Sequence, residues 1–263
     1  MLKKLLKYDL KSIFKGMIVF YVLSLFFALL TRVFFMIENS FIMNVIARIC
    51  SGTTFAMIFN ILINNLIRLW VKFKDNLYGD ESYLTHTLPV KKNELYLSKF
   101  IISVVSLFVS VLVILFSLFV AFYSKENLQL VKNFLIPLAS VYESTVIKII
   151  IAFMFVSFLE LMNMLESGYS GIIIGHRRNN AKIGFSFLFG FVVYLCTQIV
   201  AIFGVFIAAL FDKDLMNLFY TMETLDVPTI KFCIYLAIII YSVNIIVLYF
   251  VNSKIFNKGV NVD

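Results

Sequence analysis

Residues 72–99 read KFKDNLYGDESYLTHTLPVKKNELYLSK and form a polar stretch between long apolar segments. The chain of 263 residues is 62% hydrophobic and 14% charged, with a mean hydropathy of +0.97. Soluble domains carry about 25% charged residues, so this chain has too few polar groups to cover a surface exposed to water. The sequence therefore predicts an all-α integral membrane protein in which residues 72–99 meet water between two spans.

Apolar runs long enough to cross a membrane recur six times, since a helix needs about 20 residues to span the hydrocarbon core. The predicted spans are 16–37, 44–71, 95–123, 144–175, 181–211 and 229–251, within a single transmembrane domain covering 1–263. The predicted connections are a loop at 72–94, an outer loop at 124–143 with a break at Pro137, an outer segment at 212–228 and a tail at 252–263. The outer loop alternates polar and apolar residues, which is compatible with a surface helix.

Residues 1–15, MLKKLLKYDLKSIFK, repeat apolar side chains every three or four positions with five lysines between them. This pattern predicts a basic amphipathic helix lying in the headgroup plane before the first span. A simpler interpretation is a positive flank that fixes the orientation of the first span, and both can hold.

The basic residues decide the orientation. With a cytosolic N-terminus, 16 of the 23 Lys and Arg residues fall on the inner side. The outer set is Arg32, Arg48, Lys125, Lys132, Lys148, Lys213 and Lys231. Positive loops stay in the cytosol, so the sequence predicts six spans with both termini inside. The net charge of +8 is then explained by inner loops and anionic lipid headgroups, without a nucleic-acid partner.

Signatures of catalysis are absent from the sequence. It has no GxxxxGK[ST] phosphate loop, and it has no HExxH or other metal-ligand spacing. Cys50, Cys196 and Cys233 are scattered in or beside apolar segments and form no CxxC pair. We therefore expect no cofactor or metal in this chain and no enzyme activity of its own.

Polar side chains inside the predicted spans are candidates for a translocation path or gate. They are Asn60 and Asn64 in the second span, and Glu160 and Asn163 in the fourth. A carboxylate near the middle of a span costs about 3 kcal/mol on insertion scales, so Glu160 should face the protein interior or a wet cavity, or be protonated. The alternative role is hydrogen bonding between helices, and Gln198 is read as such a packing contact.

Small residues predict where helices pack closely. Ser167, Gly171 and Gly175 recur every four positions in the fourth predicted span, on the face that carries Glu160 and Asn163. Such a ridge lets two helix backbones approach each other. We expect this packing within the chain, although a dimer interface would use the same pattern.

Residues 81–99 combine an acidic and aromatic segment, then Leu-Pro-Val and two lysines, then a helix that opens with Ser-Lys. This pattern resembles the loop after the second helix in ABC-2 type ABC transporter permeases of Gram-positive bacteria. The basic N-terminus is similar to that family's interfacial elbow helix. Residues 176–178, which follow the glycine-containing end of the fourth span, are similar to its inner loop.

The resemblance implies a permease subunit in the bacterial plasma membrane, driven by a separate ATPase. Two copies of that ATPase would bind the ATP and Mg, and a second permease half, identical or homologous, would complete an exporter of amphipathic peptides, bacteriocins or drugs. The loop would act as a coupling helix that docks on the ATPase. The implied docking residues are Tyr78, Glu81, Tyr83, Leu84, His86, Leu88 and Pro89.

Other functions remain open at this stage. A secondary transporter or channel would use Glu160 as a proton or ion site and would need no ATPase. An intramembrane enzyme is disfavoured by the missing His, Asp and Glu clusters. Residues 72–94 could also be a simple connector, but loops longer than about 12–15 residues are usually functional or disordered.

Overall fold

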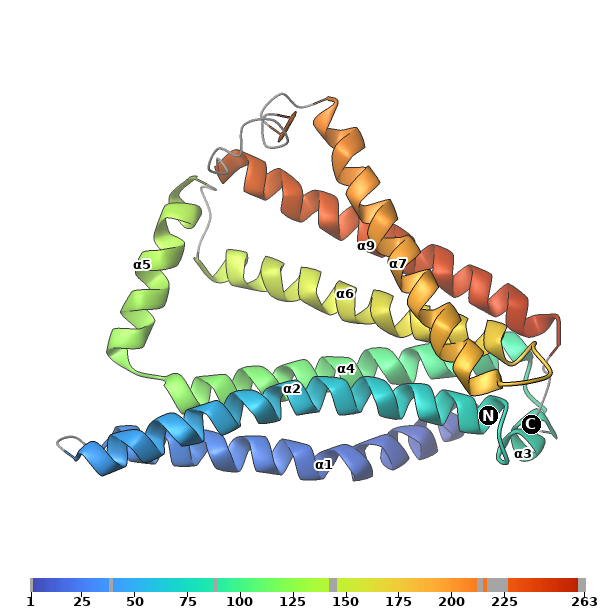
Figure 1. Ribbon diagram of the computed structural model, residues 1–263, viewed down its shortest axis with the longest axis horizontal. Coiled ribbons are helices and arrows are strands. Elements are labelled where there is room, and N and C mark those ends of the chain that lie inside the picture. The colour runs from blue at the N-terminus through green and yellow to red at the C-terminus, as the bar shows by residue number, and fades with distance from the viewer. Residues whose placement is uncertain are drawn as a thin grey trace. The chain divides into compact units, whose positions relative to one another are not determined.

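The computed structural model describes residues 2–37, 40–87, 89–141, 146–211, 215–216 and 227–259. Within these ranges the chain is helical apart from short turns, and it contains no strand. The helices are α1 Leu2–Phe35, α2 Phe41–Leu77, α3 Ser82–Thr87, α4 Lys92–Phe122, α5 Lys125–Val141, α6 Val146–Gly175, α7 Lys182–Ala209 and α9 Val227–Asn257 (Figure 1). Six of them, all except α3 and α5, are long and apolar enough to cross a membrane. This agrees with the predicted multi-pass membrane architecture.

The chain divides into two compact units. Unit 1 contains residues 1–76 and 83–129, and unit 2 contains residues 77–82 and 130–263. In unit 1, α1 packs along α4 (Figure 1), and α2 joins both through polar side chains. In unit 2, α6 packs against both α7 and α9.

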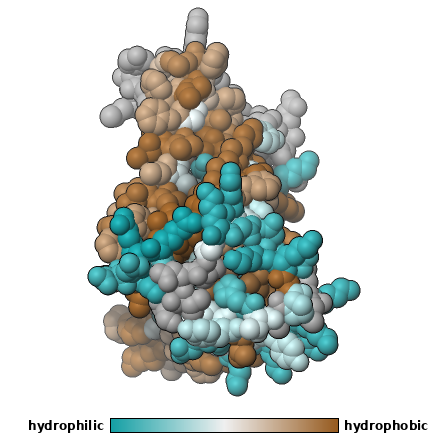
Figure 2. All heavy atoms as spheres, turned by 90° about the vertical axis from the view of Figure 1, so that its right-hand side faces the viewer, coloured by the Kyte–Doolittle hydropathy of each residue, from teal (hydrophilic) through white to brown (hydrophobic). Residues whose placement is uncertain are grey.

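The six long helices contain 28 to 37 residues. At 1.5 Å per residue they measure about 42–55 Å, whereas the hydrocarbon core is about 30 Å thick. Their ends therefore extend into the headgroup region or the water. Large apolar side chains cover the outer faces of the helices, as on α7, where Phe187 is 80% exposed. Figure 2 shows hydrophilic residues at helix ends and hydrophobic residues along the helix flanks.

The N-terminal segment differs from the prediction of a separate interfacial helix over residues 1–15. One uninterrupted helix, α1, runs from Leu2 to Phe35. Gly16 is the only weak helix former at the expected junction, and a glycine inside a helix costs only about 1 kcal/mol relative to alanine. Nothing in the local sequence therefore forces a break, and residues 2–15 prolong the first span.

Three other boundaries also differ from the predictions. Helix α2 continues to Leu77, so the first six residues of the polar stretch are helical. Helix α9 continues to Asn257, beyond the predicted end of the last span at residue 251. The predicted outer loop contains helix α5, as its alternating pattern allowed, but the helix continues through Pro137, where a break was predicted. A proline removes one helical hydrogen bond and kinks a helix, but it need not terminate it.

Close packing of α6 on α7 depends on glycine. A Cβ added to Gly171 would overlap the backbone of Ser186 and Gly190, and one added to Gly175 would overlap the backbone of Ser186. The small residues of α6 therefore contact α7 within the chain, which confirms the expected packing ridge. Ala181, in the turn between the two helices, has φ +52°, in the left-handed region.

We expect Gly171→Ala to lower the thermal stability of unit 2, because its Cβ would collide with backbone that cannot move aside. Overpacking of this kind costs about 1–3 kcal/mol. Gly184→Ala is the matched control, since nothing lies within 4 Å of its added Cβ. It should leave the stability unchanged or raise it by up to about 1 kcal/mol. Thermal unfolding of the purified protein in detergent measures both changes, and equal melting temperatures would contradict the proposed packing.

Candidate functional site

The connection between α2 and α4 carries the predicted docking residues. Its short helix α3 presents two large apolar side chains, with Tyr83 65% and Leu84 75% exposed. Glu81 and Pro89 are also exposed, whereas His86 is half-buried. Leu88 lies outside the described residues. A helix is therefore present in the predicted loop, and two of its side chains point away from the protein.

Tyr78 lies differently from what the docking prediction requires. Its side chain is 2% exposed and packs inside unit 2, with its ring centroid 4.5 Å from that of His176 and 6.4 Å from that of Phe256. Burial raises the pKa of the Tyr78 phenol, and the nearby positive charge of Arg177 opposes this shift. Tyr78 therefore stays a neutral phenol at physiological pH, and in this structure it offers no surface to a partner.

His176, which the sequence places in the loop after the fourth predicted span, is buried. It is 1% exposed, and its Nδ1 lies 2.9 Å from the carbonyl oxygen of Ile172 and 3.3 Å from Oγ of Ser186. A carbonyl oxygen only accepts, so Nδ1 carries a hydrogen that it donates to Ile172. His176 therefore helps to close the turn between α6 and α7.

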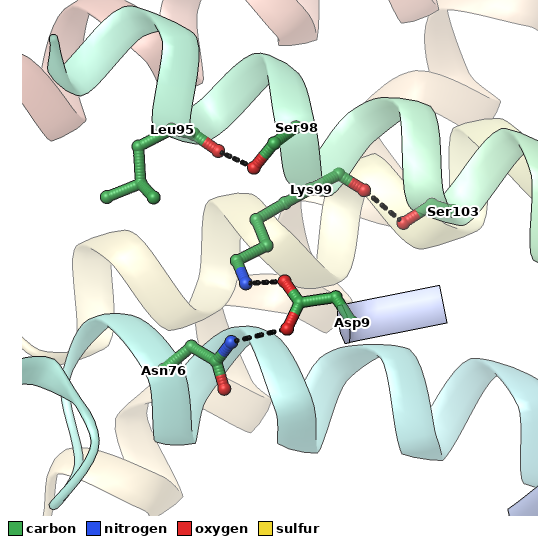
Figure 3. A network of polar contacts seen from close by, with 6 residues as sticks. All are labelled: Asp9, Asn76, Leu95, Ser98, Lys99 and Ser103. Atoms are coloured by element: carbon green, nitrogen blue, oxygen red, sulfur yellow. Dashed lines mark hydrogen bonds and ion pairs between the residues drawn. The ribbon is translucent and has the colours of Figure 1, made fainter. Parts of the chain in front are cut away.

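A buried ion pair lies in unit 1, where α1, α2 and α4 meet (Figure 3). Lys99 Nζ donates to Asp9 Oδ2, and Asn76 Nδ2 donates to Asp9 Oδ1 at 3.3 Å. Asp9, Lys99 and Asn76 are 8%, 4% and 5% exposed. The sequence analysis missed this site. The available signal was that Asp9 falls on the apolar face of its helix, among leucines at three- and four-residue steps.

Polar side chains continue along the interior of unit 1. Asn65, with no exposed surface, donates from Nδ2 to Ser110 Oγ at 2.6 Å and to the Ser106 carbonyl oxygen at 3.1 Å. Ser106 Oγ donates back to Asn65 Oδ1 at 2.8 Å. Further hydroxyl pairs are Tyr21 with Ser110, Ser24 with Ser117 and Thr31 with Thr54. These contacts tie α1, α2 and α4 to one another.

The asparagines that the sequence singled out in α2 lie on a different face. Asn60 is exposed and Asn64 is half-buried. Asn64 Nδ2 donates to Asn60 Oδ1 at 2.8 Å and to its carbonyl oxygen at 3.0 Å. The two residues thus bond to each other along one helix. The neighbouring Asn65, which the sequence analysis did not select, is buried instead.

Glu160 is the centre of a polar cluster in unit 2. Its Oε1 accepts hydrogen bonds from Tyr194 OH at 2.7 Å and from Gln198 Nε2 at 2.9 Å. Tyr241 OH donates a long bond of 3.5 Å to Gln198 Oε1 and faces the same carboxyl group. Glu160 Oε2 is buried without a hydrogen-bond partner. Gln198 therefore belongs to the Glu160 cluster and is more than the lone packing contact expected from the sequence.

Two more polar groups lie further along α6. Asn163, with no exposed surface, donates from Nδ2 to Thr197 Oγ1 at 3.0 Å. Glu166 is also fully buried, and its Oε2 accepts from Asn252 Nδ2 at 2.9 Å. Ser170 Oγ donates to Asn252 Oδ1 at 2.8 Å. The sequence analysis overlooked Glu166 and placed Asn252 in the tail, whereas Asn252 holds the end of α9 against α6.

The polar groups of both units join neighbouring helices through hydrogen bonds. Among the residues that the structure describes, no group of three His, Cys, Asp or Glu side chains could hold a metal ion. The candidate path residues divide between the units: Glu160 and Asn163 face α7 in unit 2, and Asn60 and Asn64 lie on the outer face of α2 in unit 1.

Comparison with known proteins gives no match to a protein-family model, to a curated protein or to a solved structure.

We expect Asn65→Leu to lower the stability of unit 1, because Ser106 and Ser110 lose their hydrogen bonds to Asn65 inside the helix bundle. Hydrogen bonds between membrane helices contribute about 0.6–2 kcal/mol each. Asn60→Leu, on the exposed face of the same helix, is the matched control and should be neutral or stabilising in a bilayer. Thermal unfolding in nanodiscs compares the two variants. An Asn60→Leu protein less stable than Asn65→Leu would reverse the assignment of inner and outer faces.

Proposed function

We propose that the chain is the permease subunit of an ABC-type exporter in a bacterial plasma membrane, with both termini in the cytosol. It would work with a second permease half and with separate ATPase subunits that bind ATP and Mg. The observation that supports this most is the exposed pair Tyr83 and Leu84 on α3. The resemblance of residues 81–99 to ABC-2 permeases suggests that the partner of α3 is an ATPase subunit.

Exposed apolar side chains have different meanings on the spans and on α3. On a span they face lipid and need no other partner. Helix α3 lies in the polar connection, for which the excess of basic residues predicts a cytosolic location. Adjacent large apolar side chains in water favour burial against another protein. A short helix that offers such side chains fits a groove on a partner.

The surroundings of α3 support a cytosolic contact. Basic residues cluster where α1 begins, α2 ends and α4 begins: Lys3, Lys4, Lys7, Lys11, Lys15, Arg68, Lys72, Lys74, Lys91 and Lys92. Their charges hold this end of the helices at the anionic inner leaflet. A partner that binds α3 would then approach from the cytosol, as an ATPase must. Closure of the ATPase pair on ATP would pull on α3 and shift the permease between inward-open and outward-open states.

We expect Tyr83→Asp and Leu84→Asp each to abolish the stimulation of ATP hydrolysis by the permease. A buried charge in the docking groove would lose its hydration without gaining a partner. The measurement is the ATP hydrolysis rate of the co-purified complex in nanodiscs, together with the amount of ATPase that co-purifies.

Tyr8→Asp is the matched control for the docking variants. Tyr8 is 70% exposed, close to the 65% of Tyr83, but it lies on α1 rather than on the connection. The control should keep normal stimulation. If the Tyr83 and Leu84 variants also keep it, α3 is not the docking surface.

A second candidate is a secondary transporter or channel that uses Glu160, favoured by the buried, unpartnered Oε2 of this carboxyl group. Among the described residues, Glu160 forms no ion pair, and its hydrogen bonds come from neutral side chains. A carboxyl group in this position can bind a proton or a small cation that enters from water.

Under this second candidate, wild-type protein in vesicles without any ATPase should dissipate an imposed pH gradient, and Glu160→Gln should not. Glutamine keeps the shape and the hydrogen-bonding capacity at Oε1 but cannot exchange a proton. Glu126→Gln, on the exposed start of α5, is the control and should behave as wild type. A pH-sensitive dye inside the vesicles reports the flux, and no wild-type flux above that of empty vesicles would exclude this function.

A further inference from the structure

The Asp9 carboxylate binds both ends of the connection between α2 and α4. One oxygen, Oδ1, accepts from Asn76, the next-to-last residue of α2. The other oxygen, Oδ2, accepts from Lys99, in the second turn of α4 (Figure 3). Residues 77–91, which include α3, lie between these two anchors in the chain. A single side chain of α1 therefore fixes the exit and the re-entry of the connection.

The surroundings of the pair exclude water. Phe73 and Tyr96, each one turn before an anchor, are 1% and 0% exposed, and their rings pack edge to face with centroids 6.0 Å apart. On α1, Ile13 and Met17 follow Asp9 on the same face and are 5% and 0% exposed. Charge-assisted hydrogen bonds in such a setting are strong and directional. They fix the axial positions of the end of α2 and the beginning of α4 relative to α1.

Stability alone does not require an ion pair at this position. Replacing a buried ion pair with apolar residues of similar volume is often neutral or stabilising, whereas removing one partner leaves a costly buried charge. The ion pair and its neighbouring hydrogen bond restrict the relative positions of α2 and α4, because one donor from each helix must reach the same carboxylate. Ser98 and Ser103, beside Lys99 in α4, donate to carbonyl oxygens of their own helix (Figure 3).

We propose that Asp9 is the positioning residue of the α2–α4 connection, and that the buried face of α1 around Asp9 belongs to the coupling device. Asp9 fixes where residues 83–91 leave the helices, so that α3 is presented at a defined place and a pull on α3 reaches α1 as well as α4. The transmission of a pull rests on the proposed function, whereas the fixed position of the connection does not.

Hydrogen exchange of the full chain in nanodiscs, with no ATPase present, tests the positioning. We expect Asp9→Asn to speed amide exchange at residues 72–76 and 83–99 while exchange in α7 stays as in wild type, because local opening follows the loss of local restraints. Asp75→Asn is the matched control, because Asp75 is next to Asn76, its side chain is 45% exposed, and its ion pair within the described residues is with the neighbouring Lys74 at 3.4 Å. Unchanged exchange in Asp9→Asn, or an equal change in Asp75→Asn, would overturn the proposal.

A double variant, Asp9→Leu with Lys99→Met, separates positioning from simple stabilisation. It leaves no buried charge, so unit 1 should stay folded even if Asp9→Asn unfolds it. Faster exchange limited to residues 72–76 and 83–99 would support the proposal. Exchange as slow as in wild type would show that apolar packing suffices, and it would overturn the proposal.

The hydrolysis rate of the co-purified ATPase complex adds the functional comparison. If Asp9 positions α3 for docking, the double variant should lose most of the ATPase stimulation while its melting temperature stays near that of wild type. A connection that loosens without any change in ATP hydrolysis would count against the proposed function, and it would leave the positioning role of Asp9 intact.

Discussion

The hydrocarbon core of a membrane offers no water to polar groups, so polar side chains on a span must find partners on neighbouring helices. Apolar contacts alone fix the helix register weakly, since lipid tails are as apolar as leucine. The hydrogen bonds supply what is missing. Asn65 fixes the axial position of α2 relative to α4 through two serines. Asn163 does the same for α6 and α7 through Thr197. Each unit is therefore held in register by a few amide and hydroxyl pairs inside an otherwise apolar bundle.

The two units handle buried charge in different ways. In unit 1 the buried acid, Asp9, is neutralised by Lys99 near the end of the bundle. In unit 2, Glu160 lies inside a candidate span and accepts hydrogen bonds from the neutral side chains of Tyr194 and Gln198. A paired charge restricts geometry, whereas a carboxyl group with neutral donors can still exchange a proton or a cation. This contrast is consistent with the proposed coupling role of unit 1 and with an ion-dependent step as the alternative function of unit 2.

The sequence predicted six candidate spans and the close-packed face of α6, because hydropathy and the spacing of small residues can be read within a single segment. It did not identify the buried face of α2. Lipid-facing and core-facing positions are both apolar in a span, so the usual amphipathic periodicity vanishes and Asn64 cannot be told from Asn65. The sequence also missed the pairs Asp9–Lys99 and Glu160–Gln198. Such pairs depend on the register between helices that are distant in the sequence, and no local sequence pattern contains this register.

The continuity of α1 changes what its N-terminus can do. A separate interfacial helix would follow the lipid headgroups and move independently of the first span. A single helix from Leu2 to Phe35 is stiff along its axis, so a displacement at Asp9 must shift or tilt the whole span. Packed helices respond to such a displacement by moving as rigid elements, because their interiors do not deform continuously. The buried carboxylate on this helix is therefore well placed to turn a small movement of the α2–α4 connection into a movement at membrane depth.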